Sequence, residues 1–78
     1  MIVEESFHWR MKKKFRQDIE NYMIEHVIRR PDRLMKDRQH KNALNAIAGI
    51  PQNGRTLKVV FRRTGAEKVK LITAYYLD

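Results

Sequence analysis

The chain has 78 residues, and this length suits one small domain with a modest hydrophobic core rather than two domains. It contains no cysteine, which excludes disulfide bonds, a catalytic thiolate and zinc sites built on cysteine. Its formal net charge of +8 favours a polyanionic partner, either nucleic acid or an acidic protein, over a basic protein without such a ligand.

The apolar segments give no sign of membrane insertion or secretion. No apolar run approaches the roughly 20 residues that a membrane-spanning helix needs. Residues 1–9 lack the basic and apolar regions of a secretory signal. Because the absence of cysteine also fits a reducing compartment, we expect a cytoplasmic protein without a membrane partner.

A helical pattern begins near the N-terminus and covers residues 6–30, which contain neither glycine nor proline. Phe7, Met11 and Phe15 recur at every fourth position and predict an apolar stripe along the first part of this segment. Ser6 belongs to the residue types that cap helix N-termini, so we expect the first helix to begin there.

The second part of the helical segment carries a longer apolar face. We predict a break near residues 17–18, with Asp18 as the N-cap of a second helix that ends before Pro31. A single uninterrupted helix is the alternative. The residues of the second apolar face are Ile19, Tyr22, Met23 and Val27.

The rest of the chain is typical of strands and turns. Residues 34–38 are a short strand candidate, and residues 42–50 fit either a helix or a buried strand. A turn signal at residues 51–54 precedes two strands, at about 56–63 and 68–77. The predicted fold class is α+β, with two N-terminal helices packed on one face of a three- to four-stranded antiparallel sheet. The other face would be open to a ligand.

The last two predicted strands carry cations and hydroxyl groups. Successive side chains of a strand point to opposite faces, so Lys58 and Arg62 share a face, as do Leu71, Thr73 and Tyr75. Cations beside hydroxyl groups can hold a phosphate, and a tyrosine near cations can act as an acid or base. The alternatives are protection of a sheet edge by charge and the ordinary strand preference of threonine and tyrosine.

A second group of cations lies in the first predicted helix. Residues 10–16 hold five cations and no acid, and helical spacing places Arg10, Lys13 and Arg16 on one ridge. Such a ridge can follow a phosphate backbone without reading bases. We expect these three residues, and Arg63 of the predicted strand at 56–63, to contact nucleic acid. The alternative for the helical cations is a solvated face opposite the apolar stripe, and for Arg63 it is the protection of a sheet edge by charge.

The three histidines, His8, His26 and His40, lack the spacing of a metal site, so we expect neither a metal nor a cofactor. His8 lies beside the basic ridge and is the candidate general acid or base. His26 is expected to cap or pack at the end of the second helix, and His40 to lie in a loop. Structural or solvent-exposed roles are the alternative for all three.

The order of these segments resembles the small toxin-like nucleases of the barnase–EndoU–colicin–RelE superfamily, in particular its compact phage- and plasmid-type members. The resemblance extends from about residue 6 to residue 77. It implies one nuclease domain over residues 1–78, with two helices on one face of a four-stranded antiparallel sheet and residues 42–50 as a strand. The matching segments are residues 10–12, 19–27, 28–32, 57–61 and 71–75, of which Pro31–Asp32 and the sequence ITAY at 72–75 are the most specific.

The resemblance also implies an active site on the uncovered face of the sheet and metal-independent cleavage of RNA. An acidic antitoxin would be the protein partner. We therefore expect a small ribonuclease, the toxin of a toxin–antitoxin or phage-encoded system, in which the RNA 2′-hydroxyl attacks its own phosphate. The alternative is a non-catalytic module that binds nucleic acid or protein. The expected catalytic residues are His8 as a base, Arg38, Lys58 and Arg62 as phosphate stabilisers, and Thr73 and Tyr75 as positioning or acid groups.

Overall fold

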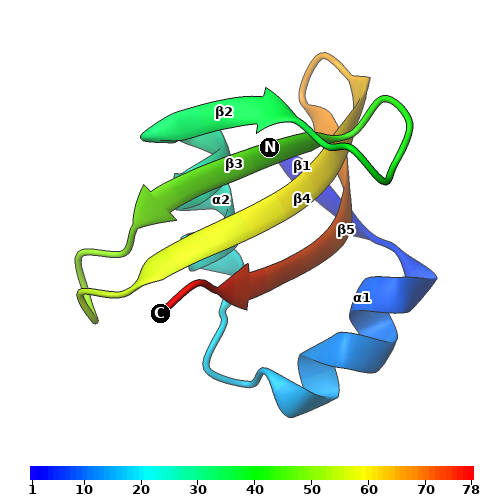
Figure 1. The fold of residues 1–78 in the computed structure, drawn as a ribbon. Helices are drawn as coiled ribbons and strands as arrows, with labels where there is room; N and C mark the ends of the chain where they lie inside the picture. Colours follow the sequence, from blue (N-terminus) through cyan, green and yellow to red (C-terminus); the bar gives the residue numbers. More distant parts are fainter.

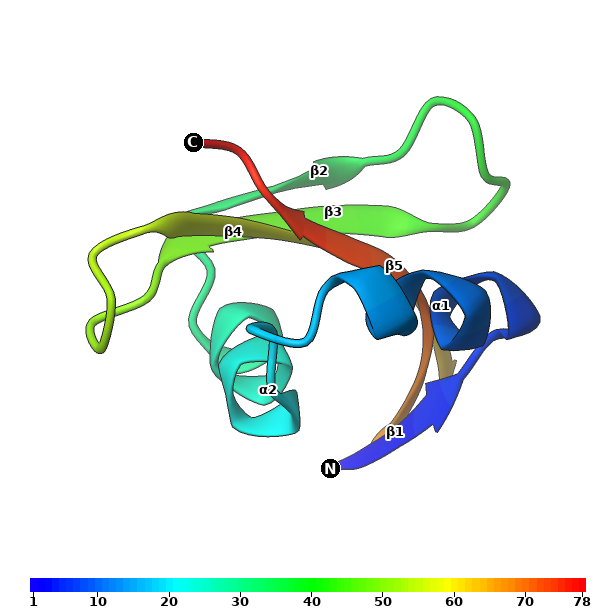
Figure 2. The ribbon, with the colours of Figure 1, turned by 90° about the horizontal axis from the view of Figure 1, so that it is seen from below.

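The computed structural model describes residues 1–78 as an α+β fold with a five-stranded sheet (Figure 1). The strands lie in the order β1-β5-β4-β3-β2. Figure 2 shows α2 beneath the sheet and α1 beside β5. The elements in chain order are β1 (Ile2–Glu5), α1 (Phe7–Lys12), the 3-10 turn η1 (Lys13–Phe15), α2 (Asn21–Arg29), β2 (Arg33–Lys36), β3 (Leu44–Gly49), β4 (Thr56–Gly65) and β5 (Lys68–Tyr76).

The sheet is mixed, because β1 pairs in parallel with β5 while the other pairs are antiparallel. The predicted number of three to four strands and the purely antiparallel arrangement are therefore wrong. The register places Ile2 opposite Lys68 and Glu5 opposite Leu71, so the N-terminal strand pairs with the first half of the last strand. A pairing between segments this far apart leaves no local signal, and β1 has only four residues.

The helical segment breaks where the sequence predicted, but the gap is longer. The Ser6 side chain accepts a hydrogen bond from the Trp9 backbone N–H at 3.1 Å, which confirms Ser6 as the cap of α1. Residues 16–20 between η1 and α2 are not helical. Glu20, and not Asp18, is the N-cap residue of α2, and α2 ends before Pro31 as predicted.

The strand predictions for the second half of the chain are confirmed apart from small shifts of their ends. The ambiguous residues 42–50 contain β3 and no helix. β4 and β5 form the C-terminal hairpin, and the short candidate at residues 34–38 corresponds to β2 at the sheet edge. No helix is long and apolar enough to cross a bilayer.

The main hydrophobic core lies between the helices and the sheet. Trp9 of α1, Ile24 and Val27 of α2, and Leu57 and Phe61 of β4 are each at most 1% exposed. Burial contributes about 1.5–3 kcal/mol for each aliphatic or phenylalanine side chain of this kind. The core therefore holds α2 against one face of the sheet and anchors α1 beside β5 through Trp9. No helix packs across the other face, which is called the open face below.

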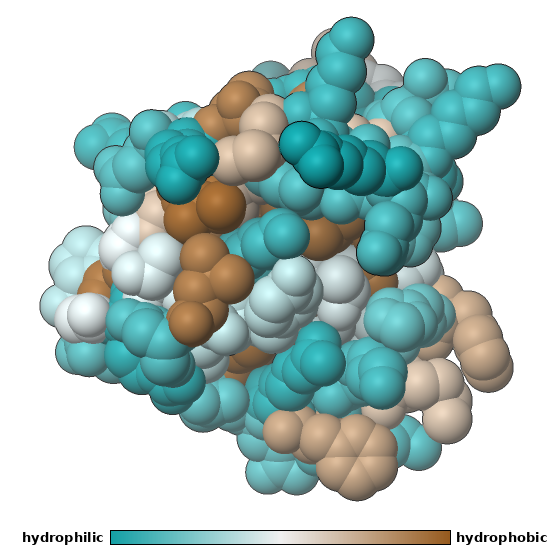
Figure 3. All heavy atoms as spheres, in the orientation of Figure 1, coloured by the Kyte–Doolittle hydropathy of each residue, from teal (hydrophilic) through white to brown (hydrophobic).

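The apolar stripe predicted for the first helix does not face this core. Phe7, Met11 and Phe15 are 77%, 47% and 86% exposed. Trp9 is the buried residue of α1 instead. The space-filling view shows weakly to moderately apolar residues protruding at the lower right, where Figure 1 places α1 (Figure 3).

Candidate functional site

A β-bulge in β5 decides which side chains reach the open face. Val60 of β4 pairs with Thr73, whereas the next residue, Phe61, pairs with Leu71, so Ile72 is an extra residue in β5. Leu71 packs in the main core, while Thr73 lines a hollow on the open face. The prediction that Leu71 and Thr73 share a face is wrong for this reason.

The open face contains a hollow of about 620 Å³, called the open-face hollow below. Lys58 of β4, Thr73 and Tyr75 of β5, Arg38 of the loop after β2 and His8 of α1 are among the residues that line it. All the predicted catalytic residues except Arg62 therefore surround one space. Figure 3 shows this side of the molecule, with strongly hydrophilic residues around weakly polar ones.

Arg62 lies outside the open-face hollow. Its Nε donates a hydrogen bond to the Lys41 carbonyl oxygen at 3.0 Å, so Arg62 holds the loop between β2 and β3. Arg63 lies on the opposite side of the sheet, where it lines a hollow next to Ile28 of α2. The two arginines are neighbours in β4, and strand alternation separates them.

Two cations lie close to the ring of Tyr75, which lines the open-face hollow. The Lys58 Nζ is 5.5 Å from the centre of the Tyr75 ring, and the Arg16 Cζ is 5.7 Å from it. Both distances fall within the range of about 6 Å over which a cation is attracted to an aromatic face. Arg16 also donates hydrogen bonds to the Thr73 Oγ1 at 3.1 Å and to the Ala74 carbonyl oxygen at 3.0 Å.

The predicted basic ridge on the first helix is divided in the structure. The α-helix ends at Lys12, and after η1 Arg16 turns toward β5. Lys13 forms a salt bridge with Glu5 at 2.9 Å. Arg10 forms no salt bridge and lines none of the hollows. Of the three ridge residues, only Arg16 therefore approaches the groups of the open-face hollow.

A histidine–carboxylate pair lies in the wall of the open-face hollow and was not expected from the sequence. The His40 Nδ1 lies 2.8 Å from the Asp37 Oδ2, and this oxygen also accepts the backbone N–H groups of His40 at 2.8 Å and Gln39 at 3.1 Å. The sequence does contain a signal for this turn, because an aspartate commonly accepts backbone N–H groups two and three residues further on. His40 lies in a loop, as predicted.

The charge of Asp37 favours one tautomer of the His40 ring. Burial alone would raise the pKa of Asp37, but hydrogen bonds from the His40 ring and backbone, from Asn45 and from Gln39 together lower it below its ordinary value. An ionised carboxylate at this place makes Nδ1 of His40 the protonated ring nitrogen. The Nε2 of His40 is then the ring position that remains for a ligand.

Asn45 of β3 supplies a buried acceptor to the same hollow. Its side chain lines the open-face hollow, the residue is 7% exposed, and its Oδ1 has no hydrogen-bond partner. A buried oxygen without a donor costs about 1–3 kcal/mol. A ligand that brings an N–H or O–H group to Asn45 would recover part of this free energy.

The chemistry of the open-face hollow is that of cations, hydroxyls and two imidazoles. His8 and His40 reach it from α1 and from the loop after β2. No group of three metal-binding side chains lies together in the chain. Comparison with family models, with curated proteins and with solved structures gives no significant match.

Proposed function

We propose that this chain is a small metal-independent ribonuclease that cleaves RNA in the open-face hollow. The observation that carries the proposal is the position of His40. Its ring contacts Asp37 at 2.8 Å and lines the same hollow as His8 and Lys58. A carboxylate-oriented imidazole, a second imidazole and a cation can supply the base, the acid and the charge stabilisation that cleavage by the RNA 2′-hydroxyl requires.

In this reaction the Nε2 of His40 takes the proton of the 2′-hydroxyl while its oxygen forms a bond to phosphorus. The bond between phosphorus and the 5′ oxygen breaks, and His8 gives that oxygen a proton. The products are a 2′,3′-cyclic phosphate and a 5′-hydroxyl end. His8 thus takes the role of the acid, and His40 the role of the base that the sequence suggested for His8.

The remaining groups of the open-face hollow bind the phosphate. Lys58 and Arg38 stabilise the negative charge that grows on its oxygens. Thr73 and Tyr75 position the RNA, and the Tyr75 ring offers a surface on which a base can stack. Arg62 contributes indirectly, because it holds the Lys41 end of the loop that carries Arg38.

The biological setting follows from the sequence resemblance and the charge. The ribonuclease would be the toxin of a toxin–antitoxin or phage-encoded system and would act on RNA in the cytoplasm. The net charge of +8 favours an acidic antitoxin as its protein partner.

A non-catalytic RNA-binding module on the same fold is the second candidate. Its specific support is the hydrogen bond from Arg16 to the Thr73 Oγ1 at 3.1 Å, because this contact takes up one acceptor position of a hydroxyl that would otherwise position the RNA for cleavage. Such a module would bind RNA with an affinity that falls steeply as salt is added.

Incubation of the purified protein with RNA in the presence of EDTA tests the proposal. We expect cleavage that leaves 2′,3′-cyclic phosphate ends. The substitution His40→Gln should slow cleavage by about 10²- to 10⁴-fold, the usual contribution of a general base. His26→Gln is the matched control, because His26 lies on α2 and lines none of the hollows. Salt-sensitive binding without cleavage by the wild type would favour the second candidate.

A further inference from the structure

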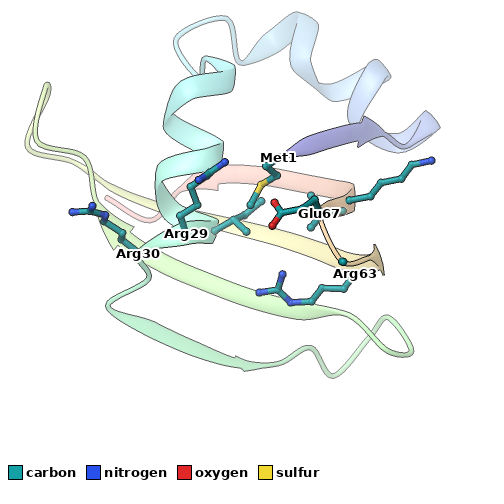
Figure 4. Close-up of a pocket in the computed structure, with 9 residues that line it drawn as sticks. Met1, Arg29, Arg30, Arg63 and Glu67 are labelled. Carbon is teal, nitrogen blue, oxygen red and sulfur yellow. The ribbon is translucent and has the colours of Figure 1, made fainter.

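A second basic hollow lies on the helix side of the sheet and is called the helix-side hollow below (Figure 4). Its volume is about 430 Å³. Arg29 and Arg30 come from the C-terminal end of α2, Arg63 from β4, and Glu67 is the only acid in the lining. In Figure 4, Arg29 and Arg63 lie on either side of Glu67, while Arg30 points outward.

The arginines of the helix-side hollow have no carboxylate partner. Arg29, Arg30 and Arg63 form no salt bridge and donate no side-chain hydrogen bond. The fourth cation of the lining, Lys68, is bound to Glu4 at 3.0 Å. The four cations of the lining outnumber its single acid, Glu67, so positive charge is in excess, and the planar N–H groups of the arginines match the geometry of a phosphate. The helix-side hollow is therefore suited to an anion.

The loop between β2 and β3 connects the two hollows. A third hollow, of about 540 Å³, is lined by Lys36 at the end of β2, by Arg63, and by Arg38, His40 and Lys41 of this loop. It shares most of the loop residues with the open-face hollow and shares Arg63 with the helix-side hollow. Cations thus continue around the end of the β2–β3 hairpin from one side of the sheet to the other.

We infer that single-stranded RNA follows this path, with its cleaved phosphate in the open-face hollow and phosphates further along the strand at Arg63 and Arg29. This inference rests on the proposed function and adds where the substrate extends. The contacts are to phosphates and do not select a base sequence. The molecule measures 30 × 26 × 24 Å, and small β domains that bind single strands cover about 4–16 nucleotides. A short oligonucleotide would occupy only the first hollow.

Binding of 2′-O-methyl RNA separates the path from catalysis, because this RNA lacks the attacking hydroxyl. The probes are a fluorescent 4-mer and a fluorescent 12-mer, titrated at several NaCl concentrations. For Arg29→Gln/Arg63→Gln we expect the slope of log K against log salt for the 12-mer to fall by about 1.4, since each lost phosphate contact on a single strand removes about 0.7. Binding of the 4-mer should not change.

Lys12→Gln/Lys14→Gln is the matched control, because it removes the same charge from residues that line none of the hollows. It should leave the 12-mer slope within about 0.3 of the wild-type value, less than half a phosphate contact. Equal 12-mer salt slopes for Arg29→Gln/Arg63→Gln and Lys12→Gln/Lys14→Gln would contradict the proposed RNA path. The proposed function is tested separately by Lys58→Ala, which should weaken binding of the 4-mer and slow cleavage. If Lys58→Ala has these effects but Arg29→Gln/Arg63→Gln does not change the 12-mer slope, the proposed active site is supported and the proposed RNA path is wrong.

Discussion

Asp37 organises one wall of the open-face hollow. One of its oxygens contacts the His40 ring and accepts the backbone N–H groups of Gln39 and His40. Hydrogen bonds to a charged group contribute about 1.5–3 kcal/mol each, roughly twice the value of neutral ones. The conformation of this loop, and with it the position of Arg38, therefore depends on the negative charge of Asp37.

Replacement of Asp37 by Asn should lower the free energy of unfolding by about 1–2 kcal/mol at pH 7, because the amide oxygen is a weaker acceptor for the same donors. The folded-state pKa of Asp37 lies below the ordinary value of 3.8. Its stabilisation is therefore complete well above that value and is lost as the pH falls through the lower folded-state pKa. Urea unfolding at pH 7, 5 and 3 measures the difference between wild type and variant. A difference that stays constant down to pH 3 would contradict this role.

Trp9 illustrates what residue spacing could not predict. Phe7, Met11 and Phe15 have the regular spacing of a buried helix face, yet they are exposed, and Trp9 is 1% exposed. α1 has only six residues, so a single side chain suffices to anchor it to the core. The side of α1 that faces the sheet is set by the attachment of β1 to β5 just before it. That attachment is a long-range contact which the local sequence does not encode.

At the scale of elements, Ser6 joins α1 to the bulge in β5. The Ser6 Oγ accepts the Trp9 N–H and donates to the Ile72 carbonyl oxygen, both at 3.1 Å. The Ser6 backbone N–H donates to the Leu71 carbonyl oxygen at 3.0 Å. Ser6 thus provides hydrogen-bond partners for one N–H group in the first turn of α1 and for the carbonyl oxygens of Leu71 and Ile72 at the bulge. These contacts tie the placement of His8 to that of β5.

The substitution Ser6→Ala should therefore destabilise the protein by about 1–2 kcal/mol, the upper part of the usual cost of losing a helix cap. Urea denaturation gives the value, and Thr64→Ala is the control because Thr64 is exposed in the C-terminal hairpin. We also expect slower RNA cleavage, since His8 follows Ser6 by two residues. A loss of less than about 0.5 kcal/mol, the range of ordinary surface substitutions, would mean that the bulge does not depend on Ser6.

The bulge also explains how far the candidate site could be predicted from the sequence. Alternation along β4 correctly separated Lys58 from the buried Leu57, and alternation along the end of β5 correctly grouped Thr73 with Tyr75. The extra residue Ile72 reverses the alternation relative to Leu71, and nothing in its residue type indicates this. The sequence predicts a loop at His40, but the contact of His40 with Asp37 depends on the path of that loop over the sheet.

At the scale of the whole molecule, positive charges greatly outnumber their partners. The chain has 17 lysines and arginines against nine acids, and only four salt bridges form, one of which involves His40. Exposed pairs of this kind contribute little to stability, with a median of about 0–1 kcal/mol. We therefore expect repulsion among the remaining cations to outweigh the attraction within the pairs.

Added salt should consequently stabilise the fold. Between 20 and 300 mM NaCl we expect the free energy of unfolding to rise by on the order of 1 kcal/mol, the interaction energy of two unit charges about 4 Å apart in water. Lys12→Glu/Lys14→Glu lowers the net charge by four, from +8 to +4, and should show a smaller rise. Stability that falls with salt would show that pairs such as Arg55–Asp18 dominate instead.

RNA affinity should change in the opposite direction over the same range, because salt weakens phosphate contacts while it relieves repulsion within the protein. If one preparation becomes more stable but binds RNA more weakly as salt is added, the unpaired cations serve to bind RNA and do not stabilise the fold.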